Sequence, residues 1–344
     1  MTLDGLSASN VEIAASRLHT IIQGFKGKRV LVVGDMVADE YLTGNPTRIA
    51  REAPVLLLEL FEEYIVPGGA ANVAVNASAL GAEVLLAGVV GNDTSGSKLR
   101  HAVGALGMCQ DGLLTDSTRP TITKTRVMAG SSQVVRQHVL RIDRIDRSEV
   151  SEPYKSQLIA YIQEVLPSID VLMLSDYDNG MISPAIIQSC LPLARELEKI
   201  IVVDSHGAFS RFQGITALTP NQPEAEAALG ITIHSDTDLN EAGARLLQGS
   251  RAKSVLITRG REGISLFETD QPPLHMPIFH LPNVSEVVDP NGAGDTVAAT
   301  YALALAASAS MPEAAYLANA AAALVVRRLG AASNTPEELA GLFS

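Results

Sequence analysis

The chain has 344 residues, of which 47% are hydrophobic and 19% charged, a composition typical of packed soluble proteins rather than disordered ones. Its net charge is −12 and its basic residues form no long run, which argues against a nucleic-acid partner and against binding to an anionic membrane. Cys109 and Cys190 lie far apart in the sequence, so we expect two buried, reduced thiols rather than a disulfide framework or a thiolate metal site.

Residues 1–27 mix charged with apolar side chains and contain no continuous apolar stretch resembling a signal sequence. This segment predicts a peripheral helix. The most apolar stretch elsewhere, Ala298–Ala309, is too short to span a bilayer. We therefore expect a cytoplasmic protein.

Five short runs rich in β-branched residues predict the strands of a sheet. The first, Lys28–Asp35, contains a glycine near its end, as buried parallel strands do when their carboxyl end points at a site. The other runs are Val84–Val90, Val171–Ser175, Ile200–Asp204 and Ser254–Thr258. Segments with helical periodicity separate most of them, and this alternation predicts an α/β fold with a doubly wound, mostly parallel sheet flanked by helices.

Two stretches depart from this alternation. Val55–Val66 and Thr121–Ile142 are rich in β-branched residues but are interrupted by charges, as exposed or edge strands are. We expect a single catalytic domain spanning residues 1–344, with a small β lid formed by insertions at about residues 41–66 and 119–143. Exposed strand edges invite pairing with a second chain, so the lid also predicts a homodimer.

The last third of the chain shifts to helix. Gly292–Ala307, Met311–Leu329 and Pro336–Phe343 are rich in Ala and Leu, and Gly330 is placed as a stop signal for the second of these helices.

The segment Val287–Thr296 carries the strongest signal for chemistry, because a glycine-flanked turn opens an Ala-rich helix there. Backbone N–H groups of Gly292, Ala293 and Gly294 can converge on one point, where the helix dipole also favours an anion such as phosphate. Asp295 lies at the mouth of this hole, where it can take the proton from an attacking hydroxyl during phosphoryl transfer. From this turn alone, a helix-capping role and a catalytic role for Asp295 are equally plausible.

A second glycine–helix junction follows the first lid segment. Gly68 and Gly69 permit close approach of the backbone, and Asn72 can hydrogen-bond a polyol substrate, although small residues near a helix start more often indicate close packing. Asp35 and Asp39 follow the first strand, at the end of the sheet where ligands usually bind, and Asp39 is the better candidate for a polyol ligand.

These two junctions, Gly68-Gly69 with Asn72 and later Asp289–Asp295, resemble in order and spacing the two signature regions of the ribokinase-like (PfkB) carbohydrate kinases. The resemblance covers nearly the whole chain. It implies ATP-dependent transfer of phosphate to a sugar or sugar phosphate, with Asp295 as the base. It also implies ATP and Mg²⁺ as cofactors, with a monovalent cation as a further candidate.

Other motifs extend the resemblance to the nucleotide side of the site. Thr219–Glu224 is similar to the Asn-x-x-Glu element of the family, which implies that Asn221 and Glu224 organise phosphate and that Glu224 reaches Mg²⁺ through water. The remaining nucleotide contacts implied by the resemblance are Thr258, Gly260, Asn319 and Asp204.

Several stretches resemble one subfamily, the bacterial heptose-7-phosphate kinases, which phosphorylate the anomeric hydroxyl of D-glycero-D-manno-heptose 7-phosphate. These stretches are Val32–Tyr41, Arg48-Ile49 with Glu52–Val55, Pro120–Arg126 and Leu174–Tyr177. The resemblance implies that Lys124, Arg126 and Arg136 are lid cations that hold the substrate phosphate, and solvated surface charges are the alternative.

Two positions depart from the subfamily pattern. Asn179 and His206 stand where lysines are expected, so another sugar or a nucleoside stays open as the substrate. The same departures motivate an alternative of another class, a sugar-binding sensor without turnover. Subfamily members are often fused to an adenylyltransferase domain, whereas this sequence ends at Ser344 without one, so we expect a stand-alone kinase.

Specific spacings argue against other enzyme classes. A nicotinamide dehydrogenase needs Gly-x-Gly-x-x-Gly after the first strand, where this chain reads Gly34-Asp-Met-Val-Ala-Asp39. Gly91–Lys98 falls short of a P-loop because Ser97 separates Gly96 from the lysine. The seven histidines show no pair at metal-ligand spacing, which argues against a zinc hydrolase.

Overall fold

Strand β1 (Arg29–Gly34) lies inside the larger of two sheets, and its side chains alternate between two cores. Val30 and Val32 belong to one apolar cluster, and Leu31 and Val33 to the other, because successive side chains of a strand point to opposite faces. This burial on both faces explains the continuous apolar run in the sequence. The computed structural model describes residues 13–131, 134–207, 209–279, 289–328 and 330–343.

The large sheet has nine strands in the order β13-β12-β11-β10-β9-β8-β1-β4-β5. Besides β1 they are β4 (Glu83–Gly91), β5 (Cys109–Asp116), β8 (Val171–Asp176), β9 (Ile200–Ser205), β10 (Ala217–Leu218), β11 (Ser254–Thr258), β12 (Ile264–Glu268) and β13 (Leu274–Met276). Within this sheet, β5, β4, β1, β8, β9, β10 and β11 pair in parallel, each with the next. Strands β12 and β13 extend the edge beyond β11 in antiparallel fashion. The five predicted strands and the mostly parallel sheet are confirmed.

Strand β1 pairs with β4 on one side and with β8 on the other. The chain first adds β4 on one side of β1 and later adds β8 on the opposite side. The point between β1 and β8 is therefore a topological switch point. In open α/β sheets, ligands bind outside the carboxyl ends of the strands at such a point. The carboxyl ends of β1 and β8 thus mark the place to look for a site.

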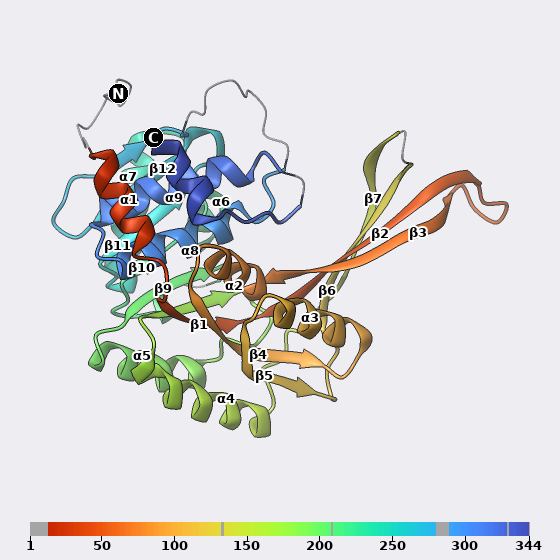
Figure 1. Cartoon of the computed structure of the whole chain (residues 1–344), viewed down its shortest axis with the longest axis horizontal. Helices are drawn as coiled ribbons and strands as arrows, with labels where there is room; N and C mark the ends of the chain where they lie inside the picture. Colours follow the sequence, from red (N-terminus) through yellow and green to blue (C-terminus); the bar gives the residue numbers. More distant parts are fainter. Residues whose placement is uncertain (1–12, 132–133, 208, 280–288, 329, 344) are drawn as a thin grey trace.

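Helices cover both faces of this sheet (Figure 1). One face carries α1 (Ala15–Gln23), α2 (Ala70–Ala79), α3 (Thr94–Ala105), α8 (Ala293–Ala306), α9 (Met311–Val325) and α10 (Pro336–Ala340). The other carries α4 (Glu152–Val165), α5 (Pro184–Glu196), α6 (Gln222–Leu229) and α7 (Asp236–Ser250). Helix α9 ends before the predicted Leu329, and the carbonyl of Val326 accepts a hydrogen bond from the amide of Asp289 at 3.0 Å.

A second sheet forms the lid and extends away from the large sheet as two long hairpins (Figure 1). Its strands are β2 (Met36–Ile49), β3 (Leu56–Gly69), β6 (Ile122–Ser131) and β7 (Val134–Arg144), in the order β3-β2-β6-β7. Only Asp35 separates β2 from β1, so the lid grows directly out of the carboxyl edge of the large sheet. These strands overlap the two predicted insertions, and β2 begins before the first of them, at Met36.

The two cysteines differ in their surroundings. Cys190 is buried and Cys109 is partly exposed, and both are free thiols. The prediction of two buried thiols is therefore right for Cys190 and wrong for Cys109. Across the described parts of the chain, no helix has the length and apolar character needed to cross a membrane.

Candidate active site

The glycine-flanked turn precedes α8. Gly292 has a φ of 78°, a left-handed conformation that side chains with a Cβ rarely adopt. A Cβ at this position would lie 2.8 Å from Nδ2 of Asn72. The amide of Ala293 donates to the carbonyl of Pro290, whereas those of Gly292, Gly294 and Asp295 have no acceptor among the described residues. The amides available to an anion are thus those of Gly292, Gly294 and Asp295, so that Asp295 takes the place of Ala293 in the predicted set.

Asp295 is buried, with 7% of its surface exposed, and both its carboxylate oxygens accept hydrogen bonds. Nδ2 of Asn72 donates to Oδ2 at 2.5 Å, and the hydroxyl of Tyr177 donates to Oδ1 at 3.1 Å. Burial raises the pKa of Asp295 to about 6, against the lowering effect of these two hydrogen bonds; the charge of Asp39 raises this pKa and that of Lys124 lowers it. A carboxylate with a pKa close to neutral is suited to accept a proton during turnover.

Two asparagines join α2 to α8. Nδ2 of Asn76 donates to the carbonyl of Asn72 at 2.9 Å, and Oδ1 of Asn76 accepts from the hydroxyl of Thr296 at 2.7 Å. All three residues are buried. The backbone of Asn72, which the sequence predicts as a polyol ligand, is therefore held in place, and its side-chain amide contacts Asp295.

Gly68 and Gly69 end β3 where it passes closest to the first strand. A Cβ at Gly68 would lie 2.8 Å from the carboxylate of Asp39, and a Cβ at Gly69 would lie 2.6 Å from the carbonyl oxygen of Asp35. Gly69 also has a φ of 56°, in the left-handed region. Close packing accounts for both glycines, and a contact between their amides and a substrate stays a prediction.

Two predicted lid cations lie at the base of the lid. Lys124 on β6 is the register partner of Asp39 on β2, and Nη1 of Arg126 lies 2.9 Å from Oδ1 of Asp39. Nζ of Lys124 lies 4.8 Å from the ring centroid of Tyr177, and burial lowers the pKa of this lysine. The base of the lid therefore brings Lys124 and Asp39 close to Asp295, and Arg126 forms an ion pair with this Asp39.

Arg136 lies apart from this group. It is the third residue of β7, and the start of β7 pairs with the end of β6. Figure 1 shows this end of the two strands far from the large sheet. Nη1 of Arg136 forms an exposed ion pair with Oε2 of Glu62 at 2.7 Å. The structure thus does not bring Arg136 together with Lys124 and Arg126, because these two pair with Asp143 and Arg141 toward the end of β7, whereas Arg136 lies near its start.

Asp35 is 1% exposed, and its carboxylate is occupied by backbone amides. The N–H groups of Tyr177, Asn179 and Met181 donate to it at 2.8, 3.3 and 3.3 Å. Burial raises the pKa of Asp35 to about 6, although the hydrogen bond from Tyr177 opposes this. The geometry therefore speaks against the predicted sugar contact, because this carboxylate holds the loop after β8.

The Asn-x-x-Glu element lies at the start of α6 and forms a capping box. The amide of Glu224 donates to Oδ1 of Asn221 at 2.9 Å, and the amide of Asn221 donates to Oε2 of Glu224 at 2.8 Å. Oε1 of Glu224 lies 3.0 Å from Nδ1 of His206. Burial, together with the charges of Asp295 and Glu224, raises the pKa of Asp204 well above its usual range. A cation at this end of the site would relieve the repulsion between these carboxylates.

The carboxylates of Glu224 and Asp204 fit a metal ion that takes most of its ligands from phosphate and water. In the described ranges, no group of three or more His, Cys, Asp or Glu side chains is arranged to hold a metal ion. Mg²⁺ usually binds one or two carboxylates and completes its shell with waters and substrate phosphates. Glu224 with Asp204 therefore suits Mg²⁺ that arrives with a nucleotide.

The remaining predicted nucleotide contacts divide into two groups. Thr258 ends β11 and forms a parallel bridge with Asn221, and Gly260, with a φ of 55°, has open space around it. Asn319 on α9 is buried, and its Nδ2 donates to the carbonyl of Pro277 at 2.7 Å. The structure thus brings Thr258 to Asn221, whereas the amide of Asn319 supports a neighbouring segment.

Tyr177 is the residue of this site whose role the sequence does not reveal. It enters the sequence analysis only within the stretch Leu174–Tyr177, yet its hydroxyl contacts Asp295 and its ring lies 4.5 Å from that of His206. The available signal was its position directly after β8, at the predicted switch point. A hydrogen bond to a residue 118 positions away leaves no trace in a single sequence.

Comparison with known proteins identifies relatives over most of the chain. The family described as "pfkB family carbohydrate kinase" matches residues 28–338. "Bifunctional protein HldE" of Geobacter metallireducens is 41% identical over 312 residues, which is 90% of this chain and 62% of that protein. The protein of the same name from Caulobacter vibrioides is 41% identical over 324 residues, or 94% of this chain and 65% of that protein. The chain thus spans less than two thirds of the length of these relatives.

Solved structures share the fold at low sequence identity. A ribokinase from Arabidopsis thaliana, complexed with ribose and ATP, has a TM-score of 0.70 at 20% identity and covers 93% of this chain and 99% of its own. Phosphofructokinase-2 from Escherichia coli, in complex with potassium, has a TM-score of 0.73 at 18% identity. The match covers 92% of this chain and 98% of the phosphofructokinase chain. The predicted ribokinase-like fold is confirmed.

Proposed function

The chain belongs to the pfkB family of carbohydrate kinases, and from this we propose that it transfers the γ-phosphate of ATP to the anomeric hydroxyl of D-glycero-D-manno-heptose 7-phosphate. The observation that carries the proposal is Asp295, a buried carboxylate held by two hydrogen bonds at the amino end of α8. The heptose assignment is supported by the lid stretches and by about 40% identity to proteins named HldE.

The proposed reaction assigns a step to each part of the site. Asp295 takes the proton from the acceptor hydroxyl, and the hydroxyl oxygen then forms a bond to the γ-phosphorus as the bond to the β-phosphate oxygen breaks. The amides of Gly294 and Asp295 and the positive end of the α8 dipole stabilise the charge that builds on the phosphoryl oxygens. ADP and a heptose 1,7-bisphosphate are the products.

Glu224 and Asp204 are the residues that would hold Mg²⁺, Glu224 through water. When bound, the ion neutralises charge on the nucleotide phosphates. Asn221 and Thr258 flank this end of the site and would contact the nucleotide. A monovalent cation stays part of the proposal, since one structural relative was solved with potassium.

Lys124 is the cation that we propose for the phosphate of the sugar. Arg126 is paired with Asp39 and would act with it, while Arg136 lies too far along the lid to join them in one chain. Asn179, at one expected lysine position, is buried, and His206, at the other, contacts Glu224. Since neither position carries a lysine, we assign the sugar phosphate to the cations at the base of the lid.

ATP turnover with a panel of acceptors tests the substrate. The panel is D-glycero-D-manno-heptose 7-phosphate, fructose, ribose and nucleosides, each with ATP and Mg²⁺. We expect the heptose phosphate to give the highest kcat/KM. Preference for an unphosphorylated sugar or a nucleoside would contradict the heptose assignment, and binding of sugars without any ATP consumption would contradict the catalytic role of Asp295.

The pH dependence of turnover follows from the pKa of Asp295. Burial raises this pKa to about 6, so the carboxylate is protonated and inactive as a base below that value. We expect kcat/KM to rise with pH through about 6 and then to level off. A profile that is flat between pH 5 and pH 8 would contradict the assignment of Asp295 as the base.

We also propose that two chains associate through the lid. Large exposed apolar side chains gather on it: Ile49, Val55, Leu56, Leu60, Phe61, Tyr64, Val139, Leu140 and Ile142. Exposed apolar surface of this kind marks an interaction site. Light scattering should give twice the mass of one chain, and Leu60→Glu with Leu140→Glu should give the monomer.

Leu106→Glu is the matched control for this experiment. Leu106 is 50% exposed, close to the 56% of Leu60 and the 55% of Leu140, but it follows α3 outside the lid. This variant should remain a dimer. A wild-type protein of monomeric mass at assay concentration would contradict the proposal.

A further inference from the structure

We propose that Tyr177 is a positioning residue for the base, and that Asp35 holds Tyr177 in the required place. The proposal rests on the role proposed for Asp295 above. Asp35 follows β1 and Tyr177 follows β8, and the proposed reaction uses neither of them directly. The proposal gives both residues a function.

The first step is the contact between Tyr177 and Asp295. The tyrosine hydroxyl donates to Oδ1 at 3.1 Å, and Asn72 donates to Oδ2 at 2.5 Å. The two donors come from different elements, the loop after β8 and helix α2, and reach opposite oxygens of one carboxylate. Together they fix the rotation of the carboxylate and favour its charged form.

The second step is the fixation of Tyr177 itself. Its backbone N–H donates to Oδ2 of Asp35 at 2.8 Å. The centroid of its ring lies 4.8 Å from Nζ of Lys124 and 4.5 Å from the centroid of the His206 ring. Burial and the charge of Asp295 raise the pKa of Tyr177 well above its usual range. The hydroxyl therefore keeps its proton and stays a donor throughout the working pH range.

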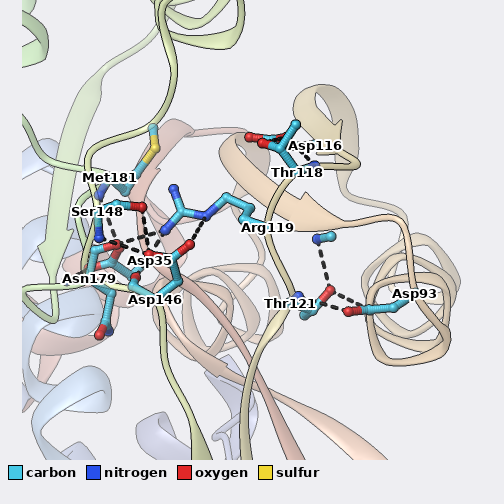
Figure 2. A network of polar contacts seen from close by, with 11 residues as sticks. Asp35, Asp93, Asp116, Thr118, Arg119, Thr121, Asp146, Ser148, Asn179 and Met181 are labelled. Atoms are coloured by element: carbon cyan, nitrogen blue, oxygen red, sulfur yellow. Dashed lines mark hydrogen bonds and ion pairs between the residues drawn. The ribbon is translucent and has the colours of Figure 1, made fainter.

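Further contacts hold the loop at Asn179, two residues after Tyr177, and Figure 2 shows Asn179 beside Asp35 and Arg119. Oδ2 of Asp35 also accepts from the amide of Asn179 at 3.3 Å. Nη2 of Arg119 donates to the carbonyl of Asn179 at 3.2 Å and to that of Asp146 at 3.0 Å. Arg119 lies in the segment that leads into β6 and Asp146 in the segment that follows β7, so the loop is joined to both ends of this lid hairpin. Anchors on both sides of the loop restrict movement of the tyrosine hydroxyl relative to Asp295.

Other charged groups around Asp295 do not replace this contact. Asp39 on β2 raises the pKa of Asp295 and Lys124 on β6 lowers it, and the charge of Asp295 in turn raises the pKa of Asp204 at the end of β9. None of these three side chains forms a hydrogen bond with Asp295 that the structure records among its described residues. The neutral donors Tyr177 and Asn72 are what orient the carboxylate.

The test is the titration of the Asp295 carboxyl carbon by ¹³C NMR in the full chain without ligands, with the signal assigned from Asp295→Asn. Tyr177→Phe removes only the hydroxyl and should move the pKa of Asp295 upward by about one pH unit, because a hydrogen bond that favoured the charged form is lost. An unchanged pKa in this variant would overturn the proposal.

Tyr301→Phe is the matched control. Tyr301 lies on α8, the same helix as Asp295, is fully buried, and its hydroxyl lies 2.9 Å from the hydroxyl of Ser254. The substitution removes a buried, hydrogen-bonded hydroxyl of the same kind but should leave the pKa of Asp295 in place. An equal rise in both variants would indicate a general loosening of the fold and would overturn the proposal.

Asp35→Asn tests the second step, and the sign of the change is informative. Removing a negative charge alone would lower the pKa of a nearby carboxyl, whereas releasing Tyr177 from its anchor should raise it. We expect a rise smaller than that in Tyr177→Phe. A fall or no change would overturn the role of Asp35, and thermal unfolding monitored by circular dichroism verifies that each variant is folded.

A kinetic readout separates this proposal from the proposed function. In Tyr177→Phe the acid limb of kcat/KM should move upward, so that turnover with the preferred acceptor falls about tenfold at pH 5.5 but less than twofold at pH 9. A uniform loss at every pH would indicate a merely structural role. If no acceptor supports turnover, the proposed function fails, while the NMR titration still decides the role of Tyr177.

Discussion

Asp295→Asn should slow turnover by about a hundred- to ten-thousand-fold, the usual contribution of a general base. The amide has nearly the shape of the carboxylate but cannot accept the proton of the acceptor hydroxyl. Affinity for ATP and sugar should be nearly unchanged, because Asn72 can flip its amide and Tyr177 can rotate its hydroxyl to meet the new side chain. Single-turnover kinetics and equilibrium binding measure the two effects separately.

The same substitution should stabilise the fold at neutral pH. The pKa of Asp295 is raised from 3.8 to about 6, so its contribution to stability is fully present below about pH 4 and is lost as the pH rises through about 6. The charged form therefore costs on the order of 3 kcal/mol at pH 8, and the neutral amide avoids this cost. The Tm of Asp295→Asn should exceed that of the wild type at pH 8, and the difference should shrink toward pH 4.

Asp111→Asn serves as the control for both effects. Asp111 is an exposed carboxylate on β5, outside the group around Asp295. Its replacement should leave turnover and Tm nearly unchanged. Undiminished turnover in Asp295→Asn would refute its role as the base.

Gly292→Ala should lower turnover by about a hundredfold, because it disturbs both the amides at the start of α8 and the support of the base. The φ of 78° is strained for alanine, and the new Cβ would lie 2.8 Å from Nδ2 of Asn72, the group that donates to Asp295. Steady-state kinetics and thermal unfolding measure the effects on turnover and stability.

Gly230→Ala separates these effects from backbone strain alone. Gly230 follows α6 with a φ of 64°, and an added Cβ there meets nothing within 4 Å. This variant should lose about 1 kcal/mol of stability and keep its turnover. Equal turnover in the two variants would contradict the proposed role of the turn before α8.

Much of the fold could be predicted because strands that are buried on both faces have a recognisable sequence pattern. Apolar runs such as Val171–Ser175 mark the interior parallel strands, since residues on both faces must be apolar. The interior strand β10 and the edge strand β13 have only two and three residues, too few to show a period. Their pairing depends on neighbours that lie far away in the sequence.

Site residues whose position depends on the local backbone conformation could be predicted. Those whose role depends on partners far away in the sequence could be predicted less well. Asp295 follows from a turn whose glycine must adopt a positive φ at a helix start. Asp35 and Arg136 carry suitable charges, but backbone amides occupy the first and the long hairpin carries the second away from the site. Tyr177 needs the packed structure, because its partner is brought to it by α8.

The most direct test of this account is a crystal structure of Asp295→Asn with ATP, Mg²⁺ and D-glycero-D-manno-heptose 7-phosphate. We expect the anomeric hydroxyl within hydrogen-bond distance of the side chain at position 295 and in line with the γ-phosphorus, with phosphoryl oxygens facing the amides of Gly294 and residue 295. A residue 295 that faces away from both ligands, or a hydroxyl other than the anomeric one in line with the phosphorus, would contradict it.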